Sequence, residues 1–338
     1  MIVYLLRRLF LLAFVFIALS ILAFSLGYLF PGNPLQNFSG LRYFTAEQTE
    51  ILTQYYRLND GYIQQYIAYL SRIFTGDWGL SLTSQQSLLA EIRSLMPATL
   101  ELTAYALLIS FVIGIPLGIV AAIKPEGVIS RFISGLAVTG YSIPIFWWAL
   151  LLIMIFSLGL GWLPTAGRIG VLYEVNQTSG FMLLDILMSD SQYKAEAFLD
   201  AVRHLLLPTI VLATFPTTVM VRFTRDSMLE VWEQSYIKTA RAKGLNRAQV
   251  LYRHGLRNAL LPVIRQIGLQ FSTLITLGMI TEVIFSWPGI GRWLIDSIYQ
   301  RNYPAIQAGL LVISTTVISV NMLTEILHTL FNPLARKR

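Results

Sequence analysis

Long stretches without a charged side chain dominate this sequence. Six of them, at residues 9–30, 102–123, 132–167, 205–221, 266–281 and 303–324, are predominantly apolar. An α-helix needs about 20 apolar residues to cross the hydrocarbon core of a bilayer, and the third stretch is long enough for one span plus an interfacial segment. Charged residues make up only 13% of the chain, against about a quarter in soluble domains. The sequence therefore predicts an all-α integral membrane protein with six transmembrane helices.

The first apolar stretch follows Arg7 and Arg8, an arrangement that a cleavable signal peptide shares. The stretch is longer than the 7–15 residues typical of a signal core, and the sequence PGNP that follows it from Pro31 is no small-residue cleavage site. We therefore interpret residues 9–30 as a retained transmembrane helix.

Basic residues are unevenly distributed between the segments that connect the spans. Six spans place both termini on one side of the membrane, and cytoplasmic segments are enriched in lysine and arginine. An N-terminus inside the cell puts 16 of the 25 basic residues in the cytoplasm. This distribution predicts a multi-pass membrane protein with both termini cytoplasmic. The two larger regions on the opposite side of the membrane are then residues 31–97, with a helix-like stretch at 51–74, and residues 167–203.

Several chemistries lack the residues that they need. The chain has no cysteine, and His204, His254 and His328 are scattered, so neither a metal site nor a catalytic histidine inside a span is expected. No glycine directly precedes a lysine, so the phosphate loop of an ATPase is absent. The net charge of +7 lies at span ends, which argues against a nucleic-acid partner. We therefore expect that this chain is not an enzyme and has no catalytic, metal-binding or cofactor-binding residues of its own.

The longest cytoplasmic segment, residues 222–265, has a helical pattern. Its apolar and small residues recur every four positions, at Met228, Trp232, Tyr236, Ala240 and Gly244, which predicts one helix that ends at Gly244 because glycine tolerates the left-handed conformation.

A second helix is expected to begin just beyond Gly244. Asn246 offers an N-cap with Gln249 in the capping-box position, and Pro262 marks the entry to the fifth span. The pattern alone fits two readings equally: a protein-docking helix–turn–helix, or a basic amphipathic segment on anionic lipid.

Several motifs resemble one family of transporter subunits. Residues 236–245 (YIKTARAKGL) and 253–262 (RHGLRNALLP) resemble the cytoplasmic EAA loop of the membrane subunits of bacterial ABC importers. Further motifs in the same order are typical of the dipeptide and oligopeptide permeases: TGDWGLS from Thr75, MPATLEL from Met96, SIPIFW from Ser142, LGWLP from Leu160, FSWPGIGR from Phe285 and NPLAR from Asn332. The chain is most similar to the B-type permeases of the Sap subgroup, named for sensitivity to antimicrobial peptides.

The resemblance implies a type I ABC importer permease fold and a set of partners. Such a permease pairs with a second, homologous permease, expected here to be a different chain, and works with two cytosolic ATPases and a periplasmic binding protein. The ATP is used by those partners, while this chain contacts membrane lipid. The implied cargo is peptides, with polyamines such as putrescine as the alternative within the subgroup. An ion-coupled secondary carrier is the remaining rival, and the absence of an internal repeat weakens it.

The resemblance also assigns regions and residues. It divides the chain into residues 1–98, with the first helix and a periplasmic region; residues 99–330, the five-helix transporter domain with a periplasmic insertion near 167–203 and a coupling loop near 223–262; and a basic cytoplasmic tail at 331–338. Thr239 stands where the loop's namesake glutamate would be, so no salt bridge is expected from it. The residues expected to couple to the ATPases are Tyr236, Thr239, Ala240, Arg241, Ala242, Gly244, Leu245, Arg253, Asn258 and Pro262.

Polar residues inside the spans are candidates for the translocation path, because exposing them to lipid is costly. Gln270, Ser272, Thr273 and Thr276 cluster within two turns of the fifth span, although such residues also mediate helix packing. Other residues are given structural roles. Glu101, Glu282 and Glu325 are expected to snorkel to water from span ends, Gly114 and Gly118 to permit close helix packing, and Trp162, Trp287 and Trp293 to form an aromatic belt.

Overall fold

Five long apolar helices form the framework of the protein. The computed structural model describes residues 2–331. Within that range, the helices long and apolar enough to cross a membrane are α1 (Ile2–Leu29), α5 (Leu88–Ile123), α9 (Lys194–Glu233), α13 (Leu261–Ile284) and α15 (Tyr303–Phe331). A sixth span is present if the bent pair described next counts as one. The basic tail predicted for residues 331–338 lies, apart from Phe331, outside the described residues.

The predicted third span is sharply broken. It consists of α6 (Val128–Ser142), α7 (Ile145–Leu152) and the π-helical η1 (Ile153–Gly159), with a bend of 103° between the two parts. The break falls at Ile143, whose backbone is extended (φ −76°, ψ 123°) just before Pro144. A residue that precedes proline is sterically pushed out of the helical region, so the SIPIFW motif explains the bend.

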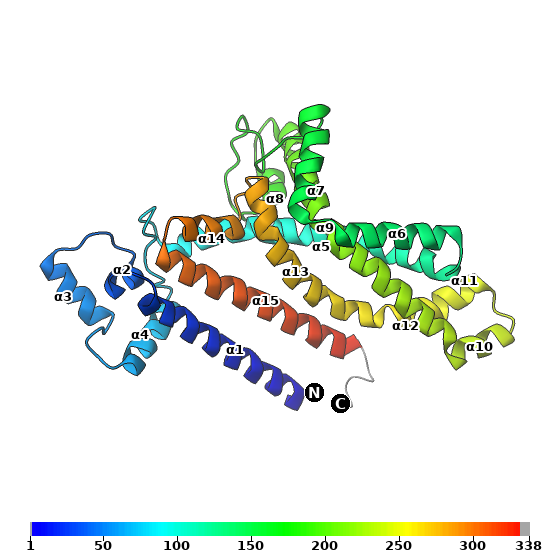
Figure 1. Cartoon of the computed structure of the whole chain (residues 1–338), viewed down its shortest axis with the longest axis horizontal. Coiled ribbons are helices and arrows are strands. Elements are labelled where there is room, and N and C mark those ends of the chain that lie inside the picture. The colour runs from blue at the N-terminus through cyan, green and yellow to red at the C-terminus, as the bar shows by residue number, and fades with distance from the viewer. Residues whose placement is uncertain (1, 332–338) are drawn as a thin grey trace.

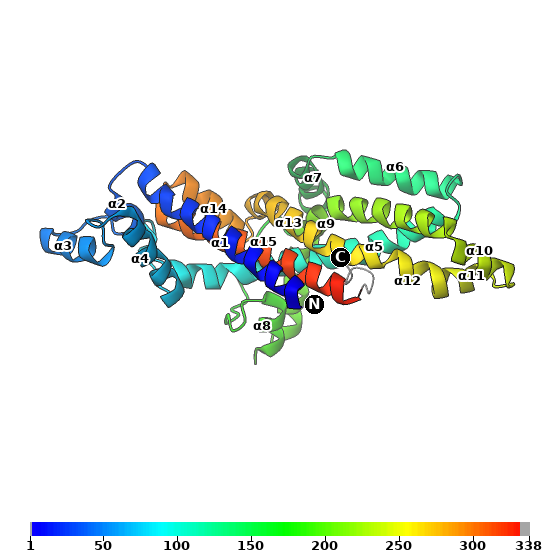
Figure 2. The ribbon, with the colours of Figure 1, turned by 90° about the horizontal axis from the view of Figure 1, so that it is seen from below.

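The remaining helices lie toward the two ends of the bundle. The end with α10 (Ser235–Ala242), α11 (Arg247–Val250), the π-helical η2 (Leu251–Gly255) and α12 (Leu256–Ala259) is called here the loop end. The opposite side of the bundle, called here the far end, is where α1 and α13 end and α5, α9 and α15 begin. It has α2 (Pro34–Ser39), α3 (Ala46–Tyr55), α4 (Tyr62–Thr75), α8 (Met182–Met188) and α14 (Ile290–Tyr299). Figures 1 and 2 show α3 and α10 at opposite extremes of the long axis.

The single helix-like stretch predicted at 51–74 corresponds to two helices, α3 and α4, separated by a turn that contains Arg57 in a left-handed conformation.

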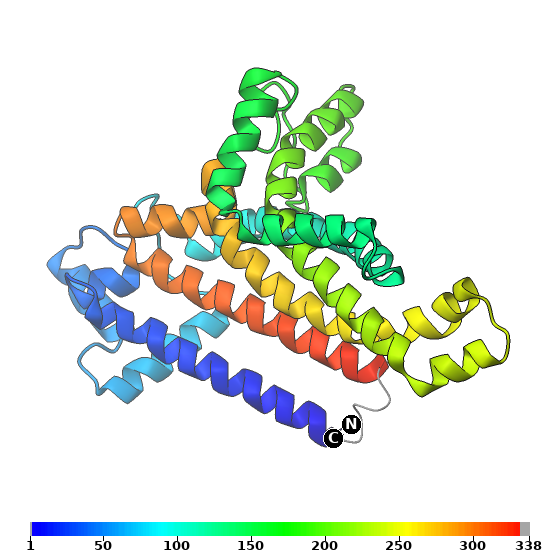
Figure 3. The ribbon, with the colours of Figure 1, turned by 45° about the vertical axis from the view of Figure 1, so that its right-hand side comes forward.

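Two helix pairings organise the bundle. α5 and α9 pack along much of their length, while α15 lies between α1 and α13, as Figure 3 shows. Gly114 and Gly118 of α5 allow the first pairing: a Cβ would lie 2.6 Å from the Met220 Cβ and 2.7 Å from the Val221 carbonyl oxygen, respectively. The predicted close packing at these two glycines is confirmed.

α9 continues through two internal prolines. Pro208 and Pro216 remove backbone donors inside the helix. Around Pro216, hydroxyl groups bond nearby carbonyls: Thr214 donates to Ile210 (2.7 Å) and Thr217 donates to Ala213 (2.6 Å). These bonds help a 40-residue helix to run unbroken from the far end to Glu233.

Candidate functional site

The loop end is a compact elbow joined directly to two long helices. α9 ends at Glu233, and the extended backbone of Gln234 (φ −65°, ψ 145°) turns the chain into α10. The prediction of one continuous helix from Met228 to Gly244 is therefore wrong, because Gln234 leaves the helical region between them. Gly244 does adopt the left-handed conformation (φ +84°), as predicted for a helix end.

A small apolar core holds the elbow against the bundle. Met228, Ile237, Ala240, Val250 and Ala259 are buried together, next to Ala122 at the end of α5. Ala240 is therefore a core residue, although the sequence placed it among the exposed coupling residues. The core fixes α10 relative to α5 and α9, so the elbow is built as part of the bundle and not as a free loop.

The second half of the elbow begins with the predicted capping box. The Asn246 backbone N–H donates to Gln249 Oε1 (3.0 Å), and the Gln249 backbone N–H donates to Asn246 Oδ1 (2.8 Å). The helix beyond is not regular, because residues 251–255 are π-helical before α12 resumes. Pro262 then lies in the first turn of α13, where the missing proline N–H costs no helical hydrogen bond.

Most of the predicted coupling residues lie on the exposed surface of the elbow. Ala240 is buried and Leu245 half-buried, while the exposed ones are Tyr236, Thr239, Arg241, Ala242, Gly244, Arg253, Asn258 and Pro262. Tyr236, Thr239, Ala240 and Leu245 line a hollow of about 390 Å³ that also contacts His254 of the second half. This hollow brings together residues from both halves and could receive a protruding part of another protein.

The four polar residues predicted for the translocation path do not share one face of α13. Gln270 is buried, and its Oε1 has no hydrogen-bond partner among the residues that the structure describes. Ser272 faces α15 and accepts a hydrogen bond from Asn321 Nδ2 (2.8 Å), which is a helix-packing contact. Thr273 and Thr276 bond carbonyl oxygens of their own helix, and of the four only Thr276 is exposed.

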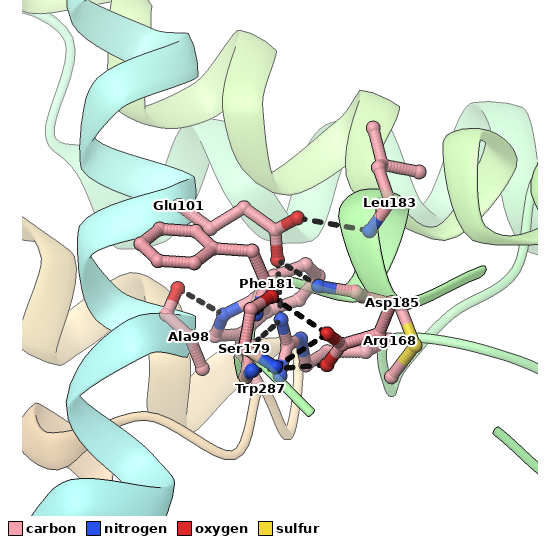
Figure 4. A network of polar contacts seen from close by, with 10 residues as sticks. Ala98, Glu101, Arg168, Ser179, Phe181, Leu183, Asp185 and Trp287 are labelled. Carbon is pink, nitrogen blue, oxygen red and sulfur yellow. Dashed lines mark hydrogen bonds and ion pairs between the residues drawn. The ribbon is translucent and has the colours of Figure 1, made fainter. Parts of the chain in front are cut away.

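A buried ion pair at the far end was missed in the sequence. Glu101 of α5 pairs with Arg168, and their side chains are only 2% and 3% exposed. Figure 4 shows Glu101 also accepting from the backbone N–H of Leu183, while the Arg168 guanidinium lies 5.4 Å from the Trp287 ring centre. The prediction that Glu101 snorkels to water is wrong, because its charge is neutralised inside the protein.

Asp185 continues this network on α8. Its carboxylate accepts bonds from the Ser179 N–H (2.7 Å), the Ser179 hydroxyl (2.6 Å) and the Gly180 N–H (2.9 Å) (Figure 4). Burial raises the pKa of the Asp185 carboxyl, but the hydrogen bonds from Ser179 and Gly180 outweigh it and hold the pKa below its ordinary value. The ionised carboxylate therefore orders the turn that leads into α8.

Glu282 performs a comparable role between α13 and α14. The fully buried carboxylate accepts from the Thr99 hydroxyl (2.5 Å) and from the backbone N–H of Arg292 (2.9 Å), in the first turn of α14. A Cβ at Gly289 or Gly291 would overlap this carboxylate, which explains both glycines of the FSWPGIGR motif. Glu282 thus caps α14, and its predicted snorkelling is also wrong.

The remaining span-end predictions have mixed outcomes. Glu325 is partly exposed but pairs with Arg8 of α1, so it links two helices. Trp287 is fully buried, with Nε1 donating to the Ala98 carbonyl (2.9 Å), so it belongs to the core and not to an aromatic belt. Trp293 is half-buried and donates to Glu91 (2.9 Å), whereas Trp162 is exposed as expected.

These features define a multi-pass α-helical membrane protein with an ordered elbow between its long helices α9 and α13. The sequence profile described as binding-protein-dependent transport system inner membrane component matches residues 114–337. A second profile, for the N-terminal region of such membrane components, matches residues 1–103. The chain belongs to the family of binding-protein-dependent transport system inner membrane components, and the resemblance seen in its motifs is confirmed.

Several known proteins match this chain over nearly its whole length. The di/tripeptide transport system permease protein of Pseudomonas aeruginosa is 45% identical over 98% of this chain and 97% of its own length. The peptide transport system permease protein of Salmonella typhimurium is 42% identical over 100% and 98%. The putrescine export system permease protein of Escherichia coli is 41% identical, with the same coverage.

The fold matches a solved ABC transporter. An inward-facing crystal structure of a methionine ABC transporter contains a chain that superposes with a TM-score of 0.52. The match covers 70% of this chain and 93% of that one, at 16% identity. The predicted type I ABC importer permease fold is thereby confirmed.

Proposed function

We propose that this subunit carries peptides across the bacterial inner membrane and couples their passage to ATP hydrolysis by separate subunits through the elbow at the loop end. The observation that carries the proposal is the construction of the elbow. Its inner side is fixed by the core around Met228 and Ala240, and its outer side presents Tyr236, Thr239 and Gly244. A protein that pulled on this surface would move α9 and α13 together, because the chain is helical up to Glu233 and resumes a helix at Leu261.

Charge supports a cytoplasmic location for the loop end. Nine basic residues fall within the stretch from Arg222 to Arg265, against three acidic ones. Cytoplasmic segments of membrane proteins carry this excess. The start of α1 and the end of α15 lie toward the loop end (Figure 3) and are then cytoplasmic, and the far end is periplasmic. ATP is bound by the partner subunits, since the sequence has no phosphate loop.

The partner set follows from this arrangement. Two ATPase subunits dock on the elbows of two permease subunits, and a periplasmic binding protein delivers the substrate at the far end. The second permease is proposed to be a different, homologous chain. Leu269, Thr276, Ile280 and Val283 form an exposed stripe on α13, and the second subunit would cover this helix face. Of the four polar residues predicted for the translocation path, Thr276 would then lie closest to a path shared by the two subunits.

Peptides are the proposed cargo because relatives at 45% and 42% identity carry that activity in their names. Putrescine is the second candidate, on the strength of the relative from Escherichia coli at 41% identity. Titrating the cognate binding protein with a dipeptide and with putrescine separates the two: retention of putrescine but no peptide would replace the first proposal by the second.

Docking at the elbow is tested by cysteine labelling. The chain has no cysteine, so a Thr239→Cys variant provides one reactive site on the exposed surface. A membrane-impermeant maleimide should label it in inside-out vesicles, and the assembled ATPase subunits should protect it. A Tyr43→Cys variant at the far end, where the side chain is 89% exposed, should be labelled only from the opposite side and should be indifferent to the ATPases. Unchanged labelling of Thr239→Cys in the complex would contradict the proposal.

A further inference from the structure

Helix α4 at the far end presents three distinct faces. Gln65 and Tyr69 are buried against the protein. A second face is apolar and exposed, with Ile63 at 74%, Ile67 at 60% and Phe74 at 75%. These positions are separated by four and seven residues, so they lie on one side of a helix.

The third face of α4 is polar. Gln64, Ser71 and Thr75 are exposed on the side next to the apolar face. Exposing an apolar stripe of this size to water is unfavourable, and if α4 were packed inside protein the stripe would be buried. The division into protein-facing, apolar and polar faces is that of a helix at a membrane surface.

Contacts place α4 at the boundary of the bundle. At its start, the Tyr62 ring lies 5.5 Å from that of Tyr28, next to the last residue of α1. At its end, Arg72 lines a small cavity with Pro304 and Gln307, in the first two turns of α15. The start of α4 therefore lies beside the end of α1, and Arg72 near the end of α4 reaches the start of α15.

The apolar face of α4 is continuous with the lipid-facing surface of α1. α4 contacts α1 at Phe16, whose ring lies 5.9 Å from that of Phe74, and at Ser20, whose hydroxyl bonds the Tyr66 hydroxyl (2.7 Å). The next positions on α1, Ile17 and Ile21, are exposed. They belong to the charge-free run at residues 9–30, so the exposed surfaces of α1 and α4 are apolar where the two helices meet.

We propose that α4 is an interfacial helix embedded in the far-end leaflet of the bilayer, with Ile63, Ile67 and Phe74 inserted among lipid acyl chains. Gln64 and Ser71 then face the headgroups. The inference does not depend on the transported substrate or on which side of the membrane the far end occupies.

This anchoring also sets the distance of the neighbouring helix α3 from the membrane surface. The Tyr55 hydroxyl of α3 donates to Asp77 (2.6 Å), and the Arg72 guanidinium lies 3.8 Å from the ring centre of the buried Tyr56. These contacts tie the end of α3 to α4. Lipid contact at α4 thus holds the exposed part of α3 at a set distance from the membrane surface.

Site-directed spin labelling in the assembled transporter tests the proposal. The cysteine-free chain allows single variants, and Ile63→Cys and Gln64→Cys form a matched pair, because neighbouring positions on a helix point about 100° apart. In nanodiscs of phosphatidylethanolamine and phosphatidylglycerol, collision of each nitroxide with oxygen and with a water-soluble nickel chelate would be measured. The label at position 63 should collide with oxygen more often, and with nickel several-fold less often, than the label at position 64. Phe74→Cys and Thr75→Cys form a second pair with the same expectation, and all four positions are exposed, so folding is preserved.

Two results would overturn the proposal. Equal access of nickel to positions 63 and 64 would place the whole helix in water. Loss of both oxygen and nickel collisions at position 63, or protection that appears only when the binding protein is added, would identify a protein partner on this face instead of lipid.

Discussion

Gly244 shows how one residue can serve both the fold and the docking surface. Its positive φ (+84°) is a conformation that side chains rarely adopt, and a Cβ there would meet no atom within 4 Å. Position 244 therefore requires a left-handed backbone conformation, but the space around it is open to a side chain. Asparagine and aspartate tolerate this conformation better than other residues, which allows charge to be varied at nearly constant shape.

Gly244→Asp and Gly244→Asn form the matched test at this position. Both should insert and fold, because the space is open. The aspartate places a charge on the surface proposed to meet the ATPases, where an unfavourable charge costs about 2 kcal/mol or more, so uptake should fall by roughly tenfold or more. The asparagine variant should retain most of its uptake. Transport assays with ATPase activity measured in parallel check this, and normal uptake by Gly244→Asp would remove the elbow from the coupling role.

Glu101 offers a second prediction at the residue scale. Glu101→Gln leaves the Arg168 guanidinium buried without its counter-charge, and breaking a buried ion pair in this way costs about 3–5 kcal/mol. The thermal unfolding temperature of the purified protein should fall markedly. Glu196→Gln, on an exposed position of α9, is the control. Equal unfolding temperatures for the two variants would mean that the pair contributes no net stability.

Among the elements, the pairing of α5 with α9 depends on backbone approach at Gly118. Gly118→Leu would force a side chain into the Val221 carbonyl, and overpacking of this kind costs about 1–3 kcal/mol, occasionally more. The variant should lose folded yield and unfold at lower temperature. Gly135→Leu on α6, where a Cβ meets nothing within 4 Å, should behave like the unmodified protein. If both variants unfold alike, α5 and α9 are not held by this contact.

The elements also show which features the sequence could predict. Helices at five of the six predicted spans, the Asn246–Gln249 capping box and the Gly114–Gly118 packing are confirmed, because each prediction depends on residues close together in the chain. Glu101 pairs with a residue 67 positions away, and a carboxylate near a span end has the same local pattern whether it reaches water or a buried arginine.

Local pattern also misled at the elbow. The four-residue spacing from Met228 to Gly244 continues across Gln234, but the chain turns there, because Ile237 and Ala240 reach the core on the inner side of the elbow only after that turn. The two glycines of FSWPGIGR were visible as a motif, but their physical reason, the carboxylate of Glu282 next to the start of α14, required the folded arrangement.

At the scale of the whole molecule, the loop end and the far end have different proposed tasks. The loop end has an elbow with a fixed inner core and an exposed outer surface. The far end has buried carboxylates that hold its segments together and an amphipathic helix, α4. Such a polarity suits a machine that receives substrate on one side and mechanical work on the other. An ion-coupled carrier would not need an external ATPase at the elbow.

Uptake by proteoliposomes tests this division most directly. The chain would be reconstituted with its partner permease and ATPases, with ATP supplied on the loop-end side, the binding protein and a labelled dipeptide on the far side, and ion gradients collapsed by an uncoupler. The account predicts uptake that requires both ATP and the binding protein and is unaffected by the uncoupler. Dipeptide movement by this chain alone, or uptake that stops with the uncoupler while ATP remains, would contradict it.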